Sequence, residues 1–95
     1  AFQIEGNSMD PVIRHNDIVV CRSIDNLNDI RDNEIYAVRS NGNVWVKYVQ
    51  KMYNNKGRLH RLKMISANYF DNDPFEEEVN ETTRLYKVVR KISNV

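Results

Sequence analysis

Ser8 is the first residue of this chain whose type and setting could support covalent chemistry. It lies in Glu5-Gly6-Asn7-Ser8-Met9-Asp10-Pro11, between an alternating stretch and a turn-forming stretch. A tight junction of this kind exposes a side chain and leaves nearby backbone N–H groups free to point at a ligand. A serine in the same place can also do no more than cap a helical turn. The heptapeptide by itself therefore leaves a nucleophile and a cap as alternatives.

Lys47 is the residue that could activate such a serine. In Asn43-Val44-Trp45-Val46-Lys47-Tyr48-Val49, alternation places Lys47 on one face of a strand with Trp45 and Val49. A lysine against an apolar surface loses hydration, which lowers the pKa of its amine. To act as a general base, that pKa must fall from about 10.4 to roughly 7 or 8, which corresponds to about 4 kcal/mol of differential solvation. The alternative is a lysine at a strand edge whose amine stays in water.

The elements that must position these two side chains are strands. Alternating apolar residues, separated by turn signals, predict seven strands, over residues 2–5, 18–24, 34–39, 43–53, 58–65, 74–79 and 82–92. Long amphipathic helices are missing, and only residues 9–13 favour a helical turn, which Pro11 would open. The expected fold class is all-β, with a strongly bent sheet that is partly closed on itself.

Four turn signals set the path between these strands. Asn41-Gly42 predicts a type I′ hairpin turn, because both central positions need a positive φ. Residues 54–57 predict a second hairpin. Asn16 and Asn33 occupy two similar turns, where asparagine can adopt the left-handed conformation that most residues avoid.

Length and composition limit the classes of function. A chain of 95 residues has room for one domain, residues 1–95. No apolar run approaches the roughly 18 residues that cross a bilayer, so no membrane contact is expected. A net charge of +1 argues against a module that neutralises many phosphates by itself, so any DNA contact is expected outside this chain. The single cysteine, Cys21, fits a packed core residue and a reducing compartment, by default the cytoplasm.

Five short motifs follow one another along most of the chain. They are Gly6-Asn7-Ser8-Met9-Asp10-Pro11, Asn16-Asp17-Ile18-Val19-Val20, Glu34-Ile35-Tyr36-Ala37-Val38, Val46-Lys47-Tyr48-Val49 and Ile65-Ser66-Ala67-Asn68. In this order they resemble the LexA-like serine peptidases of the S24 family, which includes LexA, phage repressors and UmuD-type polymerase accessory proteins. Ser8 and Lys47 are 39 residues apart, as in that family's pattern of Ser-Met followed by a strand lysine. The resemblance implies that Ser8 is the nucleophile and Lys47 the general base.

The resemblance also implies a substrate and partners. It implies a peptidase that cleaves its own chain without a cofactor, with the backbone amides of Asn7 and Ser8 stabilising the oxyanion. The expected substrate is the linker to a DNA-binding domain upstream of Ala1, and DNA would be bound only through that domain. A homodimer is the expected working form, and a RecA-type recombinase filament is the expected stimulus of cleavage during DNA damage.

The last predicted strand offers a surface for that dimer. Strict alternation places Tyr86, Val88 and Ile92 on one face and Leu85 and Val89 on the other. Two partly apolar faces favour one for the core and one for a partner.

One departure from the family leaves the activity open. Many relatives have a hydroxyl residue two positions before the lysine, where this chain has Trp45, whose indole nitrogen cannot accept a hydrogen bond. A catalytically silent dimerisation domain of a repressor and a UmuD-type accessory subunit are therefore kept as alternatives.

Three further features carry weaker hypotheses. His60 could act as a base, although a lone strand histidine is more often structural, and no metal site is expected because His15 and His60 lack ligand partners at suitable spacing. Residues 76–78, three glutamates, are typical of a solvated acidic stretch rather than of an acid/base pair. The tyrosines and basic residues of 48–63 resemble those of single-strand nucleic-acid binders.

Overall fold

The structure, a computed structural model, describes residues 1–93. Its elements in chain order are β1 (Phe2–Gln3), β2 (Ile18–Ile24), the 3-10 helix η1 (Leu27–Asp29), β3 (Glu34–Ser40), β4 (Asn43–Tyr53), β5 (Leu59–Ile65), β6 (Phe75–Glu78) and β7 (Arg84–Ile92). All seven predicted strands are present, with bounds that agree to within two residues. No helix among the described residues is long and apolar enough to cross a membrane.

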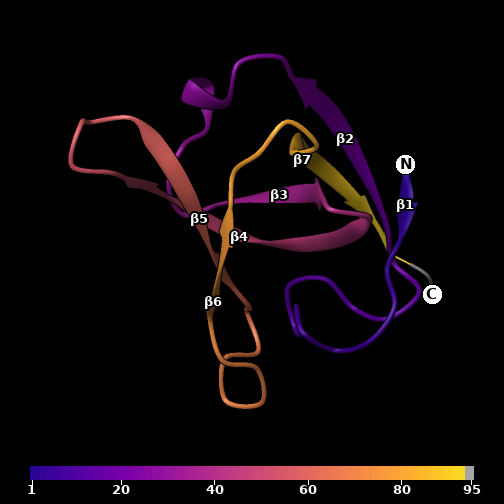
Figure 1. Ribbon diagram of the computed structural model, residues 1–95. Coiled ribbons are helices and arrows are strands. Elements are labelled where there is room, and N and C mark those ends of the chain that lie inside the picture. Colours follow the sequence, from indigo (N-terminus) through magenta and orange to yellow (C-terminus); the bar gives the residue numbers. More distant parts are fainter. Residues whose placement is uncertain (94–95) are drawn as a thin grey trace.

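All seven strands form one antiparallel sheet in the order β1-β2-β7-β3-β4-β5-β6. The sheet bends sharply, so that β5 and β6 stand on one side of the molecule and β1 and β2 on the other (Figure 1). The prediction of an all-β, strongly bent fold is confirmed.

Two hydrophobic clusters pack against the two faces of this sheet. The large cluster consists of Ile30, Tyr36, Val38, Val49, Leu62, Met64 and Leu85, and the small cluster of Ile4, Met9, Ile13 and Val19. Strand β4 contributes to both, because its side chains alternate: Trp45 packs against the large cluster and Val46 against the small one. The small cluster anchors the loop between β1 and β2, since Met9 and Ile13 of that loop are almost fully buried.

The predicted turns form as asparagine and glycine allow. Asn41 and Gly42 have φ values of 51° and 81°, as a type I′ turn requires. Asn16 and Asn33 have φ values of 71° and 68°, so both adopt the left-handed conformation. In the second hairpin, the side-chain oxygen of Asn54 accepts two backbone N–H groups of the same turn.

Helical structure is slightly more extensive than the sequence predicts. The expected turn at residues 9–13 is closed by one hydrogen bond, from the N–H of Ile13 to the C=O of Met9 at 2.8 Å. The helix η1 was not expected. It begins where the side-chain oxygen of Asn26 accepts the N–H of Asn28 at 2.9 Å and so caps the first turn.

A β-bulge changes the faces of β7. The register shifts between Val20 and Cys21 of β2, which leaves one extra residue in β7. Val88 packs against the small cluster, whereas Ile92 pairs with Ile18 on the opposite face. The predicted grouping of Ile92 with Val88 is therefore wrong, because strict alternation does not hold across a bulge.

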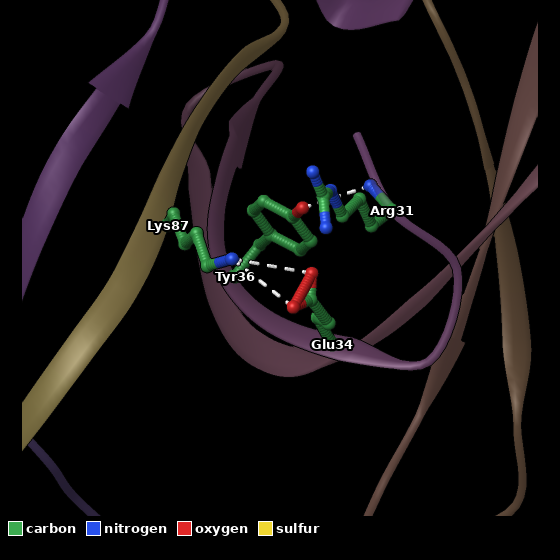
Figure 2. A network of polar contacts seen from close by, with 4 residues as sticks. All are labelled: Arg31, Glu34, Tyr36 and Lys87. Atoms are coloured by element: carbon green, nitrogen blue, oxygen red, sulfur yellow. Dashed lines mark hydrogen bonds and ion pairs between the residues drawn. The ribbon is translucent and has the colours of Figure 1, made fainter. Parts of the chain in front are cut away.

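Tyr36 is the largest side chain that is fully buried, and it ties β3 to the chain before it. Its phenol oxygen accepts the backbone N–H of Arg31 at 2.9 Å (Figure 2). Beside it, the amine of Lys87 on β7 lies 3.0 Å from a carboxylate oxygen of Glu34 on β3. Because this ion pair is partly exposed, it contributes little to stability, and the burial of Tyr36 contributes more.

Substitution of Tyr36 tests this assignment. In Tyr36→Phe the N–H of Arg31 loses its acceptor, so the free energy of unfolding should fall by about 1 kcal/mol. Tyr36→Ala should lower it by roughly 3 to 5 kcal/mol, because a cavity is also left. Urea denaturation measures both losses. Tyr53→Phe is the matched control, since Tyr53 is 55% exposed, and equal losses for the two Tyr→Phe variants would contradict the assignment.

Candidate active site

Ser8 lies in the loop between β1 and β2, where the chain reverses direction over the small cluster. Gly6 has a φ of 82°, which few other residues adopt, and its N–H donates to Nδ1 of His15 at 3.0 Å. Met9 is 1% exposed and fixes the turn to the core. The Ser8 side chain is half-buried, and among residues 1–93 its hydroxyl accepts no backbone N–H. The helix-cap alternative is therefore not supported.

Lys47 lies within β4, opposite Tyr36 of β3. It is 7% exposed, and its amine donates a hydrogen bond to Oγ of Ser66 at 2.8 Å. Because burial removes water from the amine, the pKa of Lys47 is lowered from its ordinary value. The alternative of a lysine whose amine stays in water does not hold.

Ser8 and Lys47 line the same cleft, whose volume is about 500 Å³. Residues 2–5 form one part of its lining and residues 44–47 of β4 another, and Ser8 and Met9 complete it. The fold thus brings to one site two residues that are 39 positions apart in the sequence.

The backbone of the Ser8 turn provides free hydrogen-bond donors. Within the described part of the chain, the N–H groups of Asn7, Ser8 and Met9 donate to no acceptor. The C=O groups of Asn7 and Ser8 both accept hydrogen bonds from Asn68. Since the C=O and N–H of a trans peptide point in opposite directions, the N–H groups of Ser8 and Met9 face away from Asn68. They are available to an oxyanion.

Residues 66–68 form a part of the site whose role the sequence did not predict. They follow β5 and contact both Lys47 and the Ser8 turn: Ser66 accepts from the lysine amine, and Asn68 donates to Asn7 and Ser8. The contacting residues are separated by 19 and by 61 positions. Their motif is visible in the sequence, but alternation and spacing do not reveal contacts over such separations.

The weaker candidates lie outside the cleft. His60 is on β5 and is not among the residues that line it. No group of three or more metal-ligating side chains occurs among residues 1–93. Residues 76–78 alternate between exposed and half-buried, as predicted for a solvated strand. Cys21 is half-buried against the small cluster, and desolvation raises the pKa of its thiol, which keeps it protonated.

The motifs that build this site can be compared with known proteins. No curated protein and no solved structure matches the chain. A family model described as Peptidase S24-like matches residues 1–83, a range that includes the Ser8 turn, β4 and residues 66–68. Because this match covers most of the chain, the protein belongs to the S24 family of LexA-like serine peptidases.

Proposed function

We propose that this domain is a self-cleaving peptidase with a Ser8/Lys47 dyad, and the dimerisation domain of a transcriptional regulator similar to LexA and phage repressors. The observation that carries the proposal is one cleft lined by both a half-buried serine and a buried lysine with a lowered pKa. Apart from Lys47, the titratable residue that lines this cleft is Glu5, which is exposed. The lysine amine is therefore the base available to Ser8.

The proposed reaction begins with the neutral amine of Lys47. This amine takes the proton from Oγ of Ser8 as the oxygen attacks the carbonyl carbon of a peptide bond. The backbone N–H groups of the Ser8 turn stabilise the oxyanion. When the tetrahedral intermediate collapses, the C–N bond breaks and the leaving amine receives the proton from the Lys47 ammonium. A water molecule then gives a proton to Lys47 and attacks the acyl-enzyme, and collapse of the second intermediate returns the proton to Ser8.

An extended peptide segment suits the cleft as a substrate. Strand β1 pairs with β2 alone, and β5 pairs with β4 only from Tyr48 onward. Residues 44–47 therefore have one free backbone edge within the described chain, and both they and β1 line the cleft. Free strand edges bind extended peptides through main-chain hydrogen bonds. In the proposal this peptide is the protein's own interdomain linker, upstream of Ala1.

Further elements of the proposal rest on membership of the family. A RecA-type recombinase filament would stimulate the cleavage, and a separate N-terminal domain would bind DNA. The single free cysteine fits a reducing compartment such as the cytoplasm.

An exposed apolar surface where β2 begins and β7 ends favours dimerisation. Ile18 and Ile92 are direct neighbours in register and are 37% and 47% exposed, and Val89 at the bulge is 51% exposed. In the proposed dimer, this surface meets its own copy about a two-fold axis.

The dyad predicts a pH profile for self-cleavage of the full-length protein. The rate should rise with pH through the lowered pKa of Lys47 and then level off, because only the neutral amine accepts a proton. Ser8→Ala and Lys47→Ala should each abolish cleavage, and Ser8→Ala should change the free energy of unfolding by at most about 1 kcal/mol. Gel electrophoresis after incubation between about pH 6 and about pH 10 measures the rate.

Ser23→Ala is the control for the dyad variants, because Ser23 is exposed on β2 and outside the cleft. Cleavage that survives either Ser8→Ala or Lys47→Ala would remove the dyad and leave dimerisation as the function.

The buried amine also predicts how stability depends on pH. The pKa of Lys47 is lowered in the folded state, so the unfolded state binds more protons between that pKa and about 10.4. The free energy of unfolding of the wild type, relative to that of Lys47→Met, should therefore rise as the pH rises through this window. Urea denaturation at several pH values measures the difference. Lys51→Met on the same strand is the control, and parallel pH dependences of wild type and Lys47→Met would contradict the prediction.

Dimerisation is tested by placing a charge in the exposed surface. Ile92→Glu and Ile18→Glu should convert a dimer into a monomer at micromolar concentration, because the carboxylate would be buried without a partner. Light scattering after size exclusion measures the mass. Tyr53→Glu, at an exposed position in the β4–β5 hairpin, should leave the dimer intact. A wild type that stays monomeric at high concentration would exclude this dimer.

A further inference from the structure

We propose that residues 66–68 are a positioning segment for the dyad, in which Ser66 directs the Lys47 amine and Asn68 fixes the turn that carries Ser8. The inference rests on the proposed function, because it assigns these residues a role in the same reaction. None of the three residues lines the cleft, so they act through Lys47 and Ser8 and not on the substrate.

The contact between Ser66 and Lys47 is short and buried. The distance from Nζ to Oγ is 2.8 Å, and the two residues are 7% and 3% exposed. A neutral amine has one lone pair, which must face Oγ of Ser8 to take its proton. The head of a lysine rotates freely on a flexible stem. One N–H held by Ser66 therefore restricts the directions in which the lone pair can point.

The other groups around the amine do not provide this contact. Trp45 packs against Phe75, with ring centroids 5.5 Å apart, and its indole offers no acceptor. Glu5 lines the cleft but is exposed, and the phenol of Tyr36, opposite Lys47 on β3, is bonded to the chain before that strand. Desolvation, not a neighbouring charge, lowers the pKa of Lys47. Ser66 is the hydrogen-bond partner of the amine within residues 1–93.

Asn68 holds the other half of the dyad. Its backbone N–H donates to the C=O of Ser8 at 3.0 Å, and its Nδ2 donates to the C=O of Asn7 at 3.2 Å. The N–H of Ala67 donates to Sδ of Met9 at 3.4 Å. These contacts engage three consecutive residues of the turn and orient the peptide planes on both sides of Ser8. The N–H groups offered to the oxyanion are oriented with them.

A short covalent path joins the two sets of contacts. Ile65 pairs with Tyr48, so the segment begins beside Lys47, at the start of the loop that lies at the bottom of Figure 1. Two residues after Ser66 the chain has reached the Ser8 turn. Because an extended chain spans at most about 3.6 Å per residue, this path limits the separation of base and nucleophile.

Variants of Ser66 test the positioning role in the full-length protein. Ser66→Ala should lower the plateau rate of self-cleavage by roughly tenfold to a hundredfold and move the midpoint of the pH profile to lower pH, because the ammonium form loses its acceptor. Ser66→Thr keeps the hydroxyl and should restore most of the rate. Asn68→Ala should lower the plateau without moving the midpoint, since it does not contact the amine. Ser40→Ala is the matched control, because Ser40 is buried and bonded to the hydroxyl of Thr83 at 3.1 Å outside the cleft.

A second measurement does not depend on cleavage. In full-length Ser8→Ala protein, which the proposal makes inert, ¹³C NMR of the lysine ε-carbons follows the titration of Lys47 directly. Ser66→Ala should lower the pKa of Lys47, and Ser40→Ala should not.

An unchanged Lys47 titration, or an unchanged plateau rate, in Ser66→Ala would overturn the positioning role and leave the peptidase proposal standing. A wild type that does not cleave at any pH would overturn the peptidase proposal instead. The titration would then still decide whether Ser66 holds the amine.

Discussion

The burial of the Lys47 amine is the constraint on which the site depends. Lys47 is almost fully buried, and an ammonium group is costly in such surroundings, so burial favours the neutral form that can accept a proton. The same burial requires a hydrogen-bond partner for the amine, which Ser66 provides. Stability and the proposed chemistry therefore make opposite demands on this position. The fold accepts a less favourable buried lysine where an apolar residue would pack at lower cost.

The bent sheet forms this site because β4 extends beyond its pairing with β5. The second half of this strand pairs with β5, whereas residues 44–47 have neighbours on β3 alone and face the cleft with their other edge. Where β5 ends, the chain is free to turn across the end of the sheet toward the Ser8 loop. The strand that carries Lys47 thus also fixes the start of residues 66–68.

Ser8, in contrast, lies on a loop, and the loop needs other means of support. Met9 and Ile13 bury it in the small cluster, His15 accepts the N–H of Gly6, and Asn68 holds the carbonyls beside Ser8. These contacts leave the opposite side of the turn free to bind. Trp45 stands where many members of the family have a hydroxyl residue. In our proposal Ser66 supplies that hydroxyl from the end of another strand.

The sequence by itself determined the strands and the left-handed turns at Asn16, Asn33 and Asn41, and it indicated Ser8 and Lys47 as the two residues of the proposed dyad. Alternation and turn chemistry are local, and the ordered motifs identified the family without coordinates. Only the tertiary structure decided the bulge that moves Ile92 to the other face of β7, the depth at which Lys47 is buried, and the contacts of Ser66 and Asn68. Burial and hydrogen-bond partners depend on which distant segments meet, and no local pattern specifies them. For that reason the sequence indicated which residues could react, and the folded chain determined how they are held.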